Sequence, residues 1–190
     1  MLDDLSGWPR LTQISIAVAV PAAIAASLIA APDLDGAFGA LLAVLMVAIA
    51  AIDSRRYIIP NKLVAAAAAL GLLRAGLVGP DAGLSAVAWA GCRGAAAAIP
   101  FLVLMILYRR WRKRDGLGLG DVKLAAVAGT WLGWVTIFAI IELATLSALG
   151  AYLIAGWLRR RPMRATAFLP FGLFLAPAIW VGWLAEVLLG

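Results

Sequence analysis

Seven apolar segments separated by short polar loops limit the possible folds of this chain more than any other feature. They lie at about residues 11–31, 36–52, 60–78, 84–108, 121–133, 135–158 and 167–189. Several approach or exceed the 18 or so apolar residues that a membrane-spanning helix needs. A soluble domain of 190 residues could not bury a chain that is 65% hydrophobic and 14% charged. We therefore expect a single all-α domain, residues 1–190, that forms a polytopic membrane helix bundle.

The basic residues fall almost entirely in alternate loops. If the chain starts inside and crosses seven times, fourteen of its sixteen Lys and Arg residues lie on the cytoplasmic side: Arg10, Arg55, Arg56, Lys62, Arg109, Arg110, Arg112, Lys113, Arg114, Lys123, Arg159, Arg160, Arg161 and Arg164. The other two, Arg74 and Arg93, lie within apolar segments. This is the distribution that the positive-inside rule describes, so we expect a cytoplasmic N-terminus and an outer C-terminus.

The same distribution explains the net charge of +6 without a nucleic-acid partner. The segments "RRWRKR" (109–114) and "RRRPMR" (159–164) are interpreted as orientation signals and contacts for anionic lipid headgroups. A docking surface for a charged substrate is the alternative. Because the first ten residues carry acids where a secretory signal has basic residues, we expect the first apolar segment to be a retained helix.

The fifth segment is short for a membrane span. Residues 121–133 would rise about 20 Å as a helix, against a hydrocarbon core of about 30 Å. If this segment did not cross, the basic segment 159–164 would lie outside. Charge therefore favours seven transmembrane helices, and six helices with one re-entrant segment is the alternative.

The composition also limits the chemistry. The chain has no histidine and one cysteine, Cys92, which excludes an internal disulfide, the usual zinc ligand sets and Ser-His or Cys-His catalysis. We expect Cys92 to be a small core residue, and we expect neither a metal nor another cofactor. Any catalysis must then depend on the acids.

Seven of the ten acids are expected to be solvated, because they lie in the N-terminal tail, in loops or near the end of the last segment: Asp3, Asp4, Asp33, Asp35, Asp81, Asp115 and Glu186. A further acid, Glu142, lies within the sixth segment. We expect Glu142 to form an intramembrane ion pair with Arg93, or alternatively with Arg74, since a charge in the membrane needs a partner. A proton or substrate path is the other interpretation of Glu142.

The remaining two acids, Asp53 and Asp121, share one membrane depth in the expected topology. Asp53 ends the second segment and Asp121 begins the fifth, both on the cytoplasmic side. Two facing carboxylates can share a proton and activate a water for peptide hydrolysis. Gly118 and Gly120 allow positive φ and leave room for a substrate backbone. The structural alternatives are an N-cap or first-turn acid at Asp121 and a loop cap or arginine partner at Asp53.

Three sequence segments resemble landmarks of one family, the type IV prepilin peptidases, which are membrane aspartic proteases with a GxGD motif. The segments are "AIDSRRYIIPNKL" (51–63), "DGLGLGDVKLAAVAGTWLGW" (115–134) and "FLPFGLFLAPA" (168–178). The resemblance runs from about residue 36 to 178. It implies that Asp53 and Asp121 are the catalytic pair, with Gly118, Gly120 and Lys123 as supporting residues.

The resemblance further implies a multi-pass protein of the bacterial inner membrane that cleaves the leader of prepilins or pseudopilins at the cytoplasmic face. Bifunctional members also N-methylate the new terminus through a cytoplasmic domain with zinc-binding cysteines. Here only "PDLDG" separates the first two segments and there is a single cysteine, so we expect a short form without methyltransferase activity. The alternative function from the residues alone is a small proton- or cation-coupled transporter. Presenilin-like proteases share GxGD, but their partner motifs are missing.

Overall fold

The computed structural model describes residues 10–112, 118–158 and 170–190. These residues form seven helices and no strand: α1 (Arg10–Ala30), α2 (Leu34–Arg56), α3 (Asn61–Leu77), α4 (Leu84–Arg112), α5 (Leu119–Trp131), α6 (Trp134–Leu158) and α7 (Gly172–Leu189). The expected all-α helix bundle is confirmed. The basic segment 159–164 and parts of the segments 109–114 and 168–178 lie outside the described residues.

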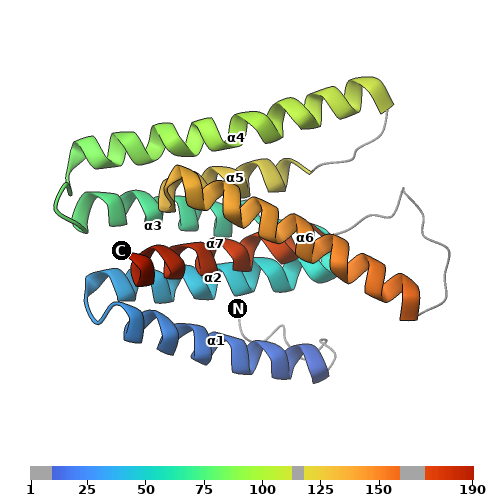
Figure 1. Cartoon of the computed structure of the whole chain (residues 1–190), viewed down its shortest axis with the longest axis horizontal. Coiled ribbons are helices and arrows are strands. Elements are labelled where there is room, and N and C mark those ends of the chain that lie inside the picture. Colours follow the sequence, from blue (N-terminus) through green and yellow to red (C-terminus); the bar gives the residue numbers. More distant parts are fainter. Residues whose placement is uncertain (1–9, 113–117, 159–169) are drawn as a thin grey trace.

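Consecutive helices run in opposite directions through the bundle (Figure 1). The ends of α2, α4 and α6 and the beginnings of α1, α3, α5 and α7 all lie at one end, on the right of Figure 1. We call this the carboxylate end, because Asp53 and Asp121 lie there. The other three connections and the C-terminus lie at the opposite end. The alternating direction of consecutive helices, which the loop charges predicted, is therefore present.

Within the described ranges, four helices are long and apolar enough to cross a membrane: α2, α4, α6 and α7. Helix α5 has 13 residues, of which nine are buried. It packs mainly against α4, α3 and α7, so neighbouring helices surround it and shield its short length from lipid. The number of helices that cross completely stays a prediction.

Small residues allow the close contact between α4 and α5. A Cβ atom on Gly129 would lie 2.6 Å from the carbonyl oxygen of Arg93, so no side chain fits there. Gly94 is similarly close to the backbone of α5. Such small-residue interfaces are typical of membrane helices, whose association depends on close packing rather than on hydrophobic burial.

The expected ion pair between Glu142 and Arg93 is wrong. Arg93 Nε donates a hydrogen bond to the carbonyl oxygen of Gly129, at 2.8 Å. Gly129 is in the last turn of α5, where carbonyl groups lack intrahelical partners, and this explains why the guanidinium turns inward. Glu142 is exposed on α6, and no ion pair joins it to Arg93 among the residues that the structure describes.

Two acids that the sequence placed in solvent instead satisfy polar groups at the opposite end. Asp35 forms a salt bridge with Arg74, with 2.8 Å between Oδ2 and Nη2. Glu186 Oε1 accepts a hydrogen bond of 2.7 Å from the Gly133 amide, between α5 and α6. Cys92 is exposed rather than in the core, because α4 lies at the outside of the bundle (Figure 1). These three expectations are therefore also wrong.

Candidate active site

Asp53 lies in the last turn of α2 and is 4% exposed. Its Oδ2 atom accepts a hydrogen bond of 3.0 Å from the backbone amide of Leu173, in the first turn of α7. First-turn amides have no partner four residues back, so a carboxylate is a favourable acceptor for them. The carboxylate of Asp53 thus joins the end of α2 to the beginning of α7.

The backbone around Asp53 is held as well. Its carbonyl oxygen accepts the amide hydrogen of Tyr57, at 2.9 Å, and Tyr57 adopts the left-handed conformation (φ 53°) that ends α2. The chain then turns through Ile59 and Pro60 into α3. This tight reversal keeps the turn between α2 and α3 close to the carboxylate.

Asp121 is the third residue of α5 and is 9% exposed. Its Oδ2 accepts a hydrogen bond of 3.3 Å from the amide of Gly118, the N-cap residue. The first-turn interpretation from the sequence is therefore confirmed as the local structural role of this acid. This capping role is compatible with catalysis, because the side chain of Asp121 lies at the same end of the bundle as Asp53.

The turn between α2 and α3 lies against α5, which carries Asp121, and against α7, whose first turn binds Asp53. A Cβ atom on Gly120 would lie 2.8 Å from Ile59 Cβ. A Cβ atom on Gly172 would lie 2.7 Å from Ile59 Cδ1 and 2.8 Å from Asp53 Oδ2. Ile59 therefore contacts α5 beside Asp121 and α7 beside Asp53. Asp53 and Asp121 are therefore linked through contacts with a single side chain, that of Ile59.

The glycines of the GxGD motif act differently from the expectation. Gly118 has φ −78° and Gly120 lies within α5, so neither uses positive φ. A Cβ atom on Gly118 would make only an ordinary contact of 3.5 Å with Asp121 Oδ2. Gly120 is needed because Ile59 leaves no room for a side chain, which is a packing requirement rather than a conformational one.

Lys123 connects two helices at the same end. Its Nζ donates a hydrogen bond of 2.7 Å to Asn61 Oδ1, at the beginning of α3. The sequence reasoning gave no role to Ile59, Asn61 or Leu173. All three lie in the segments 51–63 and 168–178 that carried the resemblance, and that is the signal that could have pointed to them.

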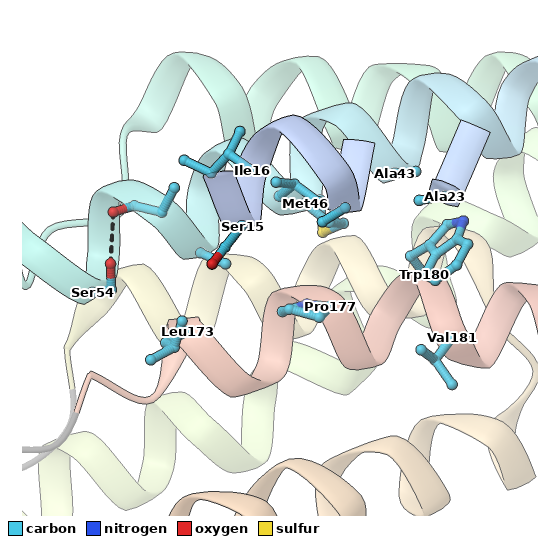
Figure 2. Close-up of a pocket in the computed structure, with 14 residues that line it drawn as sticks. Ser15, Ile16, Ala23, Ala43, Met46, Ser54, Leu173, Pro177, Trp180 and Val181 are labelled. Carbon is cyan, nitrogen blue, oxygen red and sulfur yellow. Dashed lines mark hydrogen bonds between the residues drawn. The ribbon is translucent and has the colours of Figure 1, made fainter. Parts of the chain in front are cut away.

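A cavity of about 340 Å³ lies between α1, α2 and α7, and Asp53 is not among the residues that line it (Figure 2). Ser54, which follows Asp53, and Leu173, whose amide binds it, both line the cavity. Among the described residues, no group of three or more Cys, Asp or Glu side chains could hold a metal ion. The site geometry thus consists of two buried carboxylates, two backbone donors and an adjoining apolar cavity.

The chain is similar to known proteins of one family. The family model for the type IV leader peptidase family matches residues 40–156. A prepilin leader peptidase/N-methyltransferase of Burkholderia pseudomallei (strain 1026b) is 38% identical over 141 residues, which are 74% of this chain and 43% of that protein. A protein of the same description from Escherichia coli (strain K12) is 34% identical over 182 residues, 92% of this chain and 75% of that protein.

A shorter relative, the leader peptidase HopD of Escherichia coli, is 34% identical over 132 residues, 69% of this chain and 82% of that protein. This chain spans less than half the length of several of the longer relatives. No solved structure matches it. The family match covers more than half of the chain and includes both aspartates. The chain therefore belongs to the type IV leader peptidase family.

Proposed function

We propose that this chain is an aspartic endopeptidase that removes the leader peptide of prepilins or pseudopilins at the cytoplasmic face of the bacterial inner membrane. The observation that carries the proposal is the pairing of Asp53 and Asp121. Two buried carboxylates from helices far apart in the sequence lie at one end of the bundle, and the residues next to them, Gly120 and Gly172, both approach the Ile59 side chain. Family membership and the names of the relatives support the same reaction.

In the proposed reaction, one aspartate is ionised and the other holds a proton, because two nearby buried carboxylates cannot both ionise easily. The ionised carboxylate takes a proton from a water molecule, whose oxygen attacks the scissile carbonyl carbon. The protonated carboxyl donates a hydrogen bond to the carbonyl oxygen as negative charge develops there. The carbon–nitrogen bond then breaks, and the leaving nitrogen takes up a proton from the dyad.

The backbone amides of Leu173 and Gly118 orient the two carboxylates in this reaction. Each donates to an Oδ2 atom, at 3.0 Å and 3.3 Å respectively. A hydrogen bond from the main chain to one oxygen limits rotation of the carboxylate without occupying its second oxygen. Gly120 and Lys123 support the site indirectly, through the contact with Ile59 and the hydrogen bond to Asn61.

The proposal includes the membrane topology and the domain content. The carboxylate end holds the basic connections after α2 and α4, so it is placed at the cytoplasmic face with the N-terminus inside and the C-terminus outside. The described chain is one bundle, and only residues 31–33 separate α1 from α2. With a single cysteine in the sequence, we propose peptidase activity without methyltransferase activity.

A proton- or cation-coupled transporter is the less favoured function. A relay through the membrane would require acids at successive depths that face one another. Asp53 and Asp121 instead lie together at one end, while Glu142 is exposed in the first half of α6, the helix that begins at the opposite end.

The test uses purified protein and a prepilin-type peptide, with wild type compared with Asp53→Asn and Asp121→Asn. Each substitution should abolish cleavage while the protein stays folded, because one carboxylate alone cannot act as both base and acid. Asp81→Asn is the matched control, since Asp81 is an exposed acid in the connection between α3 and α4. Full cleavage by either folded dyad variant would end the two-aspartate mechanism.

A further inference from the structure

The turn between α2 and α3 directs one of its large apolar side chains into the bundle. Of its residues 57–60, Tyr57 and Ile58 are exposed, by 56% and 62%. Ile59 is instead partly buried and packs against the core. Reversing the chain requires only the left-handed conformation of Tyr57 and the start of α3 at Pro60, so the inward orientation of Ile59 has another cause.

The turn leaves Ile59 little freedom. Before it, the amide of Tyr57 donates a hydrogen bond of 2.9 Å to the carbonyl oxygen of Asp53. After it, Pro60 restricts the preceding residue to an extended backbone, and the Pro60 carbonyl accepts the amide hydrogen of Val64 at 3.2 Å. A β-branched side chain also has a restricted χ1 angle. The backbone of Ile59 and the first atoms of its side chain are therefore fixed in position.

This side chain lies against the first turns of two other helices. A Cβ atom on Gly120 would lie 2.8 Å from Ile59 Cβ and 3.0 Å from Ile59 Cδ1. A Cβ atom on Gly172 would lie 2.7 Å from the same Cδ1. Because both positions are glycines, Ile59 meets the main chain of α5 and of α7 directly. A main chain in a helix cannot relieve such a contact by changing a rotamer.

Each of these contacts is one residue away from a group that determines where a carboxylate lies. Gly120 precedes Asp121 in the first turn of α5. Gly172 precedes Leu173, whose amide donates the hydrogen bond of 3.0 Å to Asp53 Oδ2. A shift of either helix start relative to Ile59 therefore shifts one carboxylate relative to the other.

We propose that Ile59 is a positioning residue that sets the separation of the Asp53 and Asp121 carboxylates, with its side chain as the spacer between the first turns of α5 and α7. This inference rests on the proposed peptidase function. Two carboxylates that act on one water depend on their separation, and catalytic groups tolerate displacements of only about 0.5 Å. In the competing explanation, Ile59 only packs the core and affects stability without affecting the rate of cleavage by the folded protein.

The first experiment shortens the spacer in two steps. Ile59→Val removes Cδ1 alone, and Ile59→Ala also removes both Cγ atoms. Ile141→Ala is the matched control, because Ile141 is a partly buried isoleucine that packs on the same core, in the first half of α6, which begins at the opposite end. The values of kcat and KM for a prepilin-type peptide and the melting temperature are measured on the same preparations.

We expect Ile59→Ala to lower kcat about tenfold to a hundredfold relative to Ile141→Ala, because a displacement of about 1 Å can lower a rate about a hundredfold. Ile59→Val should lower kcat by a smaller factor. KM should stay near the wild-type value, since the spacer acts on the carboxylates and not on the substrate.

Equal kcat values in folded Ile59→Ala and Ile141→Ala would overturn the inference. A change confined to KM would do the same, because it would assign Ile59 to substrate binding. If Ile59→Ala does not fold, Ile59→Val decides, and wild-type kcat in that variant would overturn the inference. If the wild type itself does not cleave the peptide, the proposed function has failed and the inference fails with it, which is a different result.

The second experiment restores part of the spacer from the side of α5. Gly120→Ala adds a methyl group where Ile59→Ala removes atoms, so the two changes oppose each other. Independent changes would multiply their effects on kcat. We expect kcat of the double variant to exceed the product of the two single losses by more than about twofold, the smallest coupling expected between residues in contact. A folded double variant whose kcat equals that product would show independent effects and contradict the spacer role.

Discussion

Gly172 lies where any side chain would displace the Asp53 carboxylate, so Gly172→Ala is a sharp test of the site geometry. The added Cβ would lie 2.8 Å from Asp53 Oδ2 and 2.7 Å from Ile59 Cδ1. Ordinary van der Waals contact begins at 3.4 Å. Ile59 can move the end of its side chain. Asp53 Oδ2, however, is held by the amide of Leu173, which is in the same turn of α7 as Gly172. The carboxylate or the beginning of α7 must therefore shift.

The required shift is the difference between 3.4 Å and 2.8 Å, about 0.6 Å. Catalytic groups must stay within about 0.5 Å of their productive positions. A displacement of about 1 Å can lower the rate about a hundredfold. We therefore expect Gly172→Ala to lower kcat by about tenfold to a hundredfold, or about 1.4–2.7 kcal/mol in activation free energy. Overpacking should reduce stability by only about 1–3 kcal/mol.

The assay is single-turnover cleavage of a prepilin-type peptide, with the melting temperature measured on the same preparation. Gly150→Ala is the matched control, because no atom lies within 4 Å of a Cβ at this position of α6. Wild-type activity in both variants would refute the reasoning, since it would show that the position of Asp53 does not limit the reaction. Loss of both folding and activity in Gly172→Ala alone would instead show that α7 cannot adjust at all.

Three other predictions concern the rest of the bundle. Gly120→Ala should lower stability by about 1–3 kcal/mol and also reduce activity, because the new Cβ would lie 2.8 Å from Ile59 Cβ. Gly118→Ala should be better tolerated, because its Cβ would make only an ordinary contact. Thermal unfolding measures the stability of both variants, and peptide cleavage measures their activity. Arg74→Leu should lower the unfolding free energy by about 3 kcal/mol, because it leaves the partly buried Asp35 without its cation. Arg93→Leu should cost less, because Arg93 binds only a backbone carbonyl. Equal losses of unfolding free energy in a denaturation series would contradict this. Cleavage should continue in excess chelator, because two carboxylates and a water need no metal; activity that disappears and returns with added metal would point to a metal enzyme.

The general architecture could be predicted from the sequence because it depends on properties that are local in the chain. The apolar segments gave the helices, and the alternation of basic and acidic loops predicted which helix ends lie together. The position of Asp53 at the end of α2 and of Asp121 at the beginning of α5 then followed from topology alone. The family resemblance identified the same two residues, and the structure places them at one end of the bundle.

The polar contacts could not be predicted, because they depend on helix rotation and on which backbone groups remain without partners. Arg93 was expected to meet an acid, yet it binds the Gly129 carbonyl in the last turn of α5. Asp35 and Glu186 were expected in solvent, yet each binds a group at the opposite end of the bundle. In each case the sequence showed the charged residue but not its partner, which is a backbone group at a helix end for Arg93 and Glu186 and the Arg74 side chain for Asp35.

These contacts at the opposite end also affect the active site, because they fix the position of α5 along the bundle axis. Arg93 binds the Gly129 carbonyl at 2.8 Å, Arg74 reaches the Trp131 carbonyl at 3.4 Å, and Glu186 binds the amide that follows α5. A helix of 13 residues is about 20 Å long, shorter than the hydrocarbon layer, so lipid alone does not fix its depth. Anchoring its C-terminal end to α3, α4 and α7 fixes its position along the bundle axis. The position of α5 in turn sets the position of Asp121 along the bundle axis, which connects Arg74, Arg93 and Glu186 to the geometry of the aspartate pair.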